Sequence, residues 1–372
     1  MVPKGWREGL VQDFLFLQRG FDLTAKSAQK GDVPVYSSSG LAYFHDEAKV
    51  NGPGIVTGRK GSVGPVYLIS EDFWPHDTTL WVKDFCGNDI NYIYYFLVFL
   101  QLEKFDEASS VPTLNRNNVH CVKCGFPPLP EQKKIAQILS VWDSAISVTE
   151  KLLTNSLQQK KSLMQQLLTG KKRLLDENGV RFSGEWIWQT IEELEALEWI
   201  ELGRGKVISK QDITRIPGEY PIYSSSVKNQ GLMGCYGLYM FDDELISWSV
   251  DGGGNFFYRP KHKFSVTNVS GYMRVQDSKL NYRFLAEQLQ LLHTKLEFDY
   301  QTKAHPSVIR KLYTVAIPSL GEQQKIAAVL SAADAEISTL EKKLACLKDE
   351  KKALMQQLLT GKRRVVVDAD AA

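Results

Sequence analysis

A long segment of this 372-residue chain is written twice. Residues 129–171 and 320–362 align without a gap at a constant offset of 191, and roughly 25 of the 43 aligned positions carry the same residue. Both copies contain Lys-Ile-Ala near the start and end on Leu-Met-Gln-Gln-Leu-Leu-Thr-Gly-Lys. Internal repetition constrains an architecture more strongly than a single motif does. We therefore expect two related halves in one chain, acting on a target with two parts.

The repeated segment has the apolar period of a long helix. Apolar residues recur in steps of three and four over about five heptads, which is the seam pattern of a coiled coil. An isolated helix would leave this seam in water, so we expect the two helices to pair with each other. Lys160 and Lys351 occupy the same seam position and are expected to set the register. The predicted seam consists of Ile135, Leu139, Trp142, Ile146, Leu153, Lys160, Leu163, Leu167, Ile326, Leu330, Ile337, Leu344, Lys351, Leu354 and Leu358.

Each predicted helix also has end signals. Pro130 lies near the first turn of the first copy, and Ser319 with Glu322 is a candidate capping box in the second. Gly170 and Gly361 stand where a C-terminal glycine cap is expected. The alternative is two independent amphipathic helices, each packed on its own domain, but such helices seldom keep a heptad register over this length.

The segments before the two helices are related but far more divergent. Pro34-Val-Tyr-Ser-Ser-Ser39 corresponds to Pro221-Ile-Tyr-Ser-Ser-Ser226, and Asn91-Tyr92 and Asn281-Tyr282 each open a helical stretch, predicted to end near Phe105 and Phe298. Short apolar runs broken by Gly, Pro, Asp and Asn predict an α+β fold rich in sheet. If the helices pair antiparallel, the chain has a pseudo-twofold organisation. The predicted parts are a first globular domain (1–128), a helix (129–170), a connector (171–183), a second globular domain (184–318), a helix (319–361) and a tail (362–372).

Charge and composition bound the possible functions. The formal net charge is only +2, so nucleic-acid binding requires local clusters of basic residues. The chain opens without an apolar leader, and its longest apolar run is too short for a bilayer. We therefore expect a cytoplasmic protein.

Catalytic and metal-binding motifs are not found in the sequence. There is no P-loop, no His-Glu-x-x-His pattern and no Asn/Asp-Pro-Pro-aromatic loop of an adenine methyltransferase. Cys121-x-x-Cys124 is a single pair without further zinc ligands, so two buried strand cysteines are expected. His76 and Asp77 have no evident nucleophile partner. We expect a chain without catalytic residues, metal or cofactor.

The repeated motifs resemble those of the DNA-specificity subunits of Type I restriction–modification enzymes. The resemblance rests on the Pro-x-Tyr-Ser-Ser-Ser segments, on Leu-Pro-Glu-Gln-Lys-Lys-Ile-Ala at 129–136 and on the two Leu-Met-Gln-Gln-Leu-Leu-Thr-Gly-Lys ends. It covers nearly the whole chain. One departure is Ser319-Leu-Gly-Glu322, which replaces a proline-rich start in the second helix.

The resemblance implies a fold and a set of partners. Each globular domain would be a target-recognition domain for one half of an interrupted double-stranded DNA sequence. The helices would act as a ruler and would dock two modification (methyltransferase) subunits. Those partners would carry S-adenosylmethionine, and restriction subunits would use ATP and Mg²⁺. The specificity subunit itself would be non-catalytic and located in the prokaryotic cytoplasm.

The glycine-rich loop Gly58–Gly64 is the best candidate for DNA contact. Glycine lets a loop approach the backbone closely, and basic side chains can reach phosphates or base edges. The corresponding loop of the second block, Ser249–Asn255, is acidic, and its basic residues come later. Each candidate has a plain alternative as a solvated turn. The candidate DNA-binding residues are Arg59, Lys60, Ser62, Asn115, Arg116, Asn117, Arg259, Lys261, Lys263, Lys303, His305 and Arg310.

The divergence of the two blocks predicts an asymmetric target. Two domains that read the same half-site would have matching loops, and these loops do not match. The rival hypotheses are a fused methyltransferase or nuclease, a scaffold protein without a specific DNA target, and an orphan specificity subunit whose partners are lost.

Overall fold

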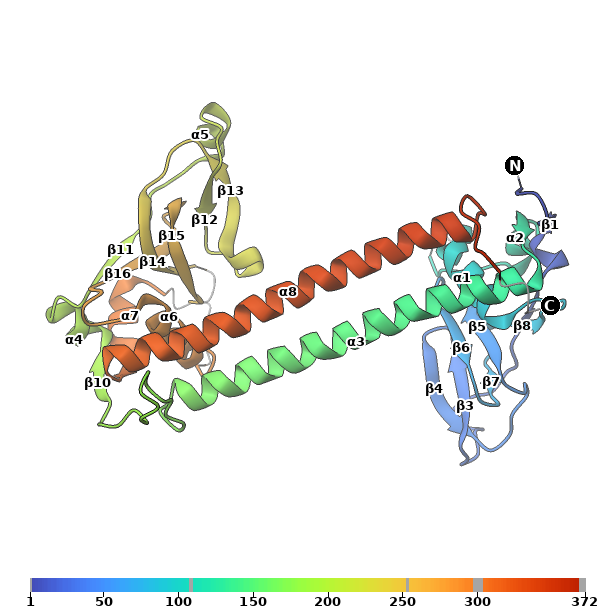
Figure 1. Ribbon diagram of the computed structural model, residues 1–372, viewed down its shortest axis with the longest axis horizontal. Helices are drawn as coiled ribbons and strands as arrows, with labels where there is room; N and C mark the ends of the chain where they lie inside the picture. The colour runs from blue at the N-terminus through green and yellow to red at the C-terminus, as the bar shows by residue number, and fades with distance from the viewer. Residues whose placement is uncertain (1, 107–109, 252–253, 297–303, 368–372) are drawn as a thin grey trace. The chain divides into compact units, whose positions relative to one another are not determined.

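The computed structural model (Figure 1) describes residues 2–106, 110–251, 254–296 and 304–367. The chain forms two compact units. The first unit comprises Met1–Lys151 with Lys342–Ala372, and the second comprises Leu152–Glu341. Each unit therefore contains one globular domain together with a part of each long helix.

The first globular domain combines three small sheets with short helices. A four-stranded sheet has the order β2-β8-β5-β6, a three-stranded sheet has the order β4-β3-β7, and β1 pairs with β9. Helix α1 packs on β5 and β6 (Figure 1). The elements are β1 (Arg7–Leu10), η1 (Val11–Asp13), β2 (Phe16–Arg19), β3 (Val33–Ser37), β4 (Gly40–His45), β5 (Gly54–Gly58), β6 (Val66–Ile69), β7 (Trp74–Pro75), β8 (Thr79–Asp84), α1 (Ile90–Leu100), η2 (Leu102–Phe105), α2 (Arg116–His120) and β9 (Lys123–Phe126).

An aromatic cluster forms the core of this domain. Phe126 stacks on Phe14 at 4.2 Å between ring centroids, and Tyr92 and Phe96 of α1 approach the same ring edge-on. All four side chains are buried. The apolar face of α1 thereby fixes the helix to the sheets, since burial of aromatic surface is the main stabilising contribution at such a site.

The second globular domain is built on a larger sheet. Six strands have the order β11-β16-β14-β15-β12-β13, and β10 pairs with β17. Helix α6 packs on β14 and β15 (Figure 1). The elements are β10 (Ile187–Thr190), α4 (Ile191–Ala196), β11 (Ile200–Arg204), α5 (Lys210–Arg215), β12 (Tyr220–Tyr223), η3 (Lys228–Gly231), β13 (Leu232–Tyr236), β14 (Phe241–Ser249), β15 (Phe256–Val266), β16 (Ser270–Val275), α6 (Tyr282–His293), α7 (Pro306–Leu312) and β17 (Thr314–Ile317).

The two domains share strand topology despite their divergent sequences. The antiparallel order β2-β8-β5-β6 of the first corresponds to β11-β16-β14-β15 of the second. A parallel pairing then recurs at the matching place, Val35 with Trp74 and Ile222 with Ser265. The predicted α+β fold is confirmed, and the duplication extends through both globular domains.

The two long helices are α3 (Leu129–Leu167) and α8 (Leu320–Leu358), each of 39 residues. In the second unit, Ser156 and Lys160 of α3 contact Glu336 and Asp334 of α8. Partner numbers fall as residue numbers rise, so the pairing is antiparallel. In the first unit, Asp143 pairs with Lys351 and Glu150 with Lys348, again in antiparallel order. Every residue of the predicted seam is buried or half-buried. The predicted pairing of the two helices as a coiled coil is therefore confirmed, and two independent helices are excluded.

The helix ends follow most of the sequence signals. Pro130 lies in the first turn of α3, and Gly170 and Gly361 have the left-handed φ values of C-terminal caps, 71° and 68°. The capping box predicted from Ser319 and Glu322 is replaced by another contact. The buried carboxylate of Glu322 pairs with Arg173 instead.

Three other details differ from the sequence expectation. The N-caps of α1 and α6 are Asp89 and Asn281, so Asp89 rather than Asn91 is the counterpart of Asn281. The helical stretch after Asp89 is split at Gln101, whose left-handed φ of 53° separates α1 from η2, and α6 ends at His293. Phe298 lies outside the described residues.

The cysteine prediction is wrong for Cys121. This residue is exposed and follows α2, while Cys124 is half-buried on β9. Within the described ranges, no group of His, Cys, Asp and Glu residues has the arrangement of a metal site. No helix in those ranges combines the length and apolar character needed to cross a membrane.

Candidate nucleic-acid interface

An ion pair with a buried glutamate connects each globular domain to the two long helices. In the second unit, the Arg173 guanidinium meets Glu322 with Nε–Oε1 at 2.5 Å and Nη2–Oε2 at 2.6 Å, and Nη1 donates to the Gly184 carbonyl. The guanidinium also lies over the ring of Trp186. Glu322 is fully buried, and its hydrogen bonds raise the pKa of Arg173. This geometry is the strong two-point form of an arginine–carboxylate pair.

The first unit contains the same device at positions displaced by 191. Arg364 meets Glu131 with Nε–Oε1 at 2.6 Å and Nη2–Oε2 at 2.7 Å, donates to the Lys4 carbonyl and lies over Trp6. In each unit the arginine follows the end of one helix and the glutamate begins the other. In each unit the ion pair therefore links α3 to α8 next to the globular domain.

A glutamine on each long helix adds a second connection. Gln132 Oε1 accepts from the Asp89 amide at 2.9 Å, and its Nε2 donates to the Pro127 carbonyl at 2.9 Å. Gln323 makes the same two contacts, with Asn281 and Pro318, at the same distances. These two contacts of the scaffold are thus duplicated in both units.

The structure brings the first domain's candidate residues together. The Leu114 amide donates to the Arg59 carbonyl at 2.7 Å, and the Gly61 amide donates to the Pro112 carbonyl at 2.9 Å. These bonds place the Gly58–Gly64 loop beside the start of α2. Arg59 is half-buried, with Nη1 on the Asp77 carbonyl at 3.1 Å, and Arg116 is half-buried over Phe16. The exposed candidates on this surface are Lys60, Ser62, Asn115 and Asn117.

The second domain has the same backbone arrangement with different side chains. The Ala304 amide donates to the Val250 carbonyl at 2.9 Å, which matches the bond between Leu114 and Arg59. His305 stands at the N-cap of α7, the position that Asn115 holds in α2, but only Asn115 makes a side-chain capping bond. His305 is exposed, with Nε2 at 3.3 Å from Nη1 of Arg204.

The other candidates of the second domain lie in different environments. Lys261 is exposed, and Lys263 is half-buried with its ammonium 4.9 Å from the centre of the Tyr239 ring. Arg310 donates two hydrogen bonds to Glu195, from Nε to Oε2 at 2.5 Å and from Nη2 to Oε1 at 2.9 Å. That pair raises the pKa of Arg310, lowers the pKa of Glu195 and fixes α7 against α4. Lys303 lies outside the described residues.

Arg259 has a place that differs from the sequence expectation. Its side chain is buried, with Nε on Ser247 Oγ at 2.9 Å and Nη2 on the Gln230 carbonyl at 2.6 Å. A guanidinium enclosed in this way supports the domain from within and is not exposed for direct contact with DNA.

Two arginines beside these surfaces are not among the candidates predicted from the sequence. Arg19 ends β2 and pairs with Asp77 at 2.9 Å, while Arg204 ends β11 and donates to the Asn268 carbonyl at 2.6 Å. Both side chains are exposed. The signal was present in the sequence as a Leu-x-Arg-Gly motif at residues 17–20 and 202–205.

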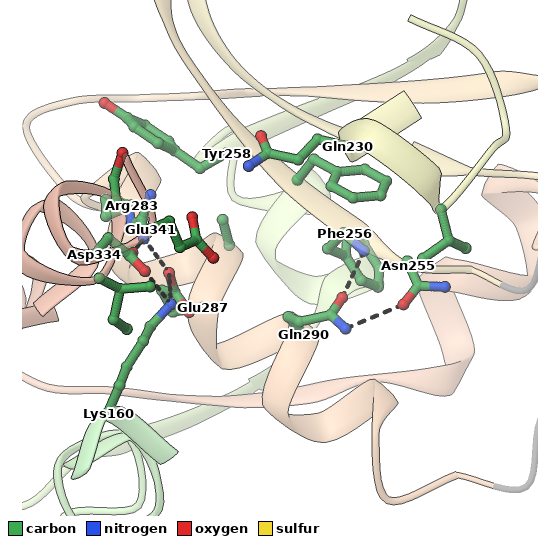
Figure 2. Close-up of a pocket in the computed structure, with 15 residues that line it drawn as sticks. Lys160, Gln230, Asn255, Phe256, Tyr258, Arg283, Glu287, Gln290, Asp334 and Glu341 are labelled. Carbon is green, nitrogen blue, oxygen red and sulfur yellow. Dashed lines mark hydrogen bonds and ion pairs between the residues drawn. The ribbon is translucent and has the colours of Figure 1, made fainter. Parts of the chain in front are cut away.

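A cavity of about 610 Å³ lies where the second domain meets the helices of its unit (Figure 2). Lys160 Nζ is 2.6 Å from Asp334 Oδ1, and Arg283 pairs with Asp334 and, at 2.5 Å, with Glu287. In the first unit the same helix position pairs Lys351 with Asp143, which also accepts from Tyr95 Oη at 2.7 Å. These charges are paired with one another, so the cavity is a structural junction.

Comparison with known families then decides the identity of the scaffold. The family model described as the Type I restriction modification DNA specificity domain matches residues 3–159 and 190–348. The two matches span most of the chain.

The chain belongs to the Type I restriction modification DNA specificity family.

Curated relatives and a solved structure agree with this assignment. A protein of Mycoplasma pneumoniae assigned as a type I specificity subunit is 31% identical over 216 residues, which are 57% of this chain and 80% of that protein. The specificity subunit of the Type I restriction enzyme MpnII, from the same organism, is 32% identical over 145 residues, 38% of this chain and 43% of that protein. The crystal structure of a Type I restriction-modification S subunit from M. genitalium matches the fold with a TM-score of 0.68 at 18% identity, covering 96% of this chain and 99% of that one.

The specificity chain is therefore a DNA-recognition subunit of a Type I restriction–modification system. Its two family matches follow the duplication seen in the structure, since each contains one globular domain and a large part of the following helix.

Proposed function

We propose that each globular domain reads one half of an interrupted DNA sequence and that the two halves are unlike. One observation carries the proposal: the scaffold contacts are duplicated, while the exposed side chains above them are not. Lys60 and Asn115 lie on this surface in the first domain, and the corresponding positions in the second domain carry Asp251 and His305. Side chains of this kind read base edges or bind phosphates, so different sets select different sequences.

We further propose that α3 and α8 set the spacer between the half-sites and dock two modification subunits. Helix α3 joins the two domains along the chain, and α8 follows the second domain and pairs with α3 through the seam. The domain bounds assigned from the sequence, 1–128 and 184–318, belong to this proposal.

The chemistry is assigned to partner subunits. We propose that the modification subunits bind S-adenosylmethionine and that restriction subunits use ATP and Mg²⁺, while this chain is non-catalytic, holds no cofactor and acts in the prokaryotic cytoplasm where it meets DNA. Calorimetry with S-adenosylmethionine tests this division. Binding is expected to the complex with modification subunits, and binding to the purified chain alone would contradict it.

A selection experiment tests the recognition function. The chain is purified with the modification subunits encoded in the same strain and is incubated with a duplex library randomised over about 20 base pairs. Enrichment of one two-part motif is expected. Retention of DNA without any enriched motif would instead favour a scaffold without sequence specificity.

A further inference from the structure

The second domain carries an insertion in one hairpin turn. In the first domain, Ser37 pairs with Gly40, and Gly40 has a φ of 103°. In the second domain, the Ser224 amide donates to the Gly231 carbonyl at 2.8 Å, and Gly231 has a φ of 83°. Both turns begin Tyr-Ser-Ser-Ser and return at this glycine, so the inserted segment is Val227–Gln230.

The inserted segment is exposed and holds an unusual backbone. Asn229 and Gln230 both have left-handed dihedral angles, with φ of 49° and 50°. Such a conformation is unfavourable for residues other than glycine and persists only where the surrounding structure supports it. Lys228 and Asn229 are exposed, with an ammonium group and a carboxamide, while Val227 and Gln230 line the edge of the cavity shown in Figure 2.

Arg259 provides that support. Its Nη2 donates to the Gln230 carbonyl at 2.6 Å, its Nε donates to Ser247 Oγ, and the guanidinium lies 3.6 Å from the centre of the Tyr223 ring. Burial lowers the pKa of Arg259 to about 10, so the group remains charged at neutral pH. A buried charge is costly unless it is fully hydrogen-bonded.

The first domain has no such device at the matching positions. Ser247 pairs across the sheet with Tyr272 as Val56 pairs with Trp81, and Arg259 faces Leu245 as Ile69 faces Gly54. Val56 and Ile69 are buried apolar residues. The polar pair of Ser247 and Arg259 therefore accompanies the insertion.

The turn also adjoins the candidate interface. Ser249 Oγ donates to the Ser225 carbonyl at 2.7 Å, which ties the root of the turn to the loop that follows β14. That loop is the counterpart of Gly58–Gly64, the loop assigned to DNA contact in the first domain.

We infer that Val227–Gln230 reads bases in the half-site of the second domain and that Arg259 is its positioning residue. The inference rests on the proposed function of the two domains. Carboxamides form paired hydrogen bonds with adenine N6 and N7 in the major groove, and lysine pairs with guanine or a phosphate. The expected target of the turn is therefore a purine edge, with adenine favoured by Asn229.

The test uses the full chain in a strain that encodes its partner subunits, with the methylated motif as readout. Asn229→Gly keeps the left-handed backbone and removes one carboxamide. The double variant Ser247→Val, Arg259→Ile restores the apolar pair of the first domain, which protects the fold while releasing the turn. Both are expected to weaken base discrimination about tenfold at positions of one half-site and to leave the other half unchanged. Lys279→Ala, an exposed lysine of the same domain, is the matched control.

An unchanged motif in Asn229→Gly and in a folded double variant would overturn the inference. If the double variant Ser247→Val, Arg259→Ile fails to fold, the methylated motif is measured in Asn229→Gly and in Gln230→Gly, and an unchanged motif in both overturns the inference. Deletion of the gene separates the two levels: loss of the motif on deletion, with no change in the variants, contradicts the turn only. Persistence of the motif after deletion contradicts the proposed function itself.

Discussion

Arg173 and Glu322 are joined by two hydrogen bonds of 2.5 and 2.6 Å, although 149 residues separate them in the chain. Arg364 and Glu131 repeat this pair in the first unit. Each pair links the end of one long helix to the beginning of the other beneath a globular domain. The duplicated sequence is therefore a duplicated set of contacts that holds each reading domain on the helix pair.

Neutralising Glu322 is expected to destabilise the second unit strongly. Glu322→Gln keeps the size of the side chain but leaves the Arg173 guanidinium, which is only 21% exposed, without its counter-charge. Breaking such a pair costs about 3–5 kcal/mol of unfolding free energy. Denaturant titration measures the loss. Glu150→Gln removes the exposed contact with Lys348 and serves as the control, with an expected cost below about 1 kcal/mol. Equal costs for the two variants would refute the structural role.

Acidification is expected to destabilise the first unit through His120. This buried side chain accepts the Leu17 amide at Nε2, and burial together with Arg116 lowers its pKa. The unfolded chain then binds the proton more readily than the folded chain, so His120 contributes stability above its usual pKa of about 6.5 that is lost as pH falls below it. Unfolding free energy measured from pH 7.5 to 5 should fall more steeply in the wild type than in His120→Gln, which keeps an acceptor without titrating. Identical pH profiles would contradict the assignment.

Lys60 and Arg310 are expected to differ sharply in their effects on DNA binding. Lys60 is exposed on the loop beside α2, so Lys60→Ala should weaken binding at all sequences and reduce the salt slope by about one, with unchanged stability. Arg310 is occupied by Glu195, so Arg310→Ala should lower stability first. Salt-dependent fluorescence anisotropy and thermal melts separate the two effects. A salt slope unchanged in Lys60→Ala would remove this loop from the interface.

Lengthening both helices is expected to lengthen the spacer of the target. One heptad inserted after Lys151 in α3 and one after Glu341 in α8 keeps the seam in register and adds about 10 Å to each helix. At about 3.4 Å per base pair, the spacer should grow by about three base pairs. Methylome mapping gives the spacer directly. An unchanged spacer in a folded, active variant would rule out the helices as its ruler.

Local periodicity made the helices predictable, whereas long-range contacts decided much of the site. The coiled-coil seam could be predicted because apolar residues recur in steps of three and four along each helix, from Ile135 in α3 and from Ile326 in α8. Glu322 was assigned to a local cap, because nothing near it in the sequence points to Arg173. Arg259 was assigned to DNA for its charge alone, since the side of the sheet on which it lies depends on a register shift between β14 and β15, with one extra residue in β15 between Arg259 and His262.

Comparison of the two related domains reveals features that neither domain shows by itself. Comparing the two domains exposes Arg19 with Arg204, and it shows that Val227–Gln230 is an insertion. Lys60, Ser62 and Asn117 could be grouped from the sequence only as loop residues. Their placement on one surface depends on backbone bonds between segments about 50 residues apart, from Arg59 to Leu114.

We propose above all that one duplicated scaffold carries two globular domains that recognise unlike DNA half-sites. Single-molecule methylome sequencing of the strain, with and without this gene, tests it most directly. We expect one motif that disappears with the gene and that consists of two different half-sites separated by unspecified bases. A palindromic or uninterrupted motif would contradict it.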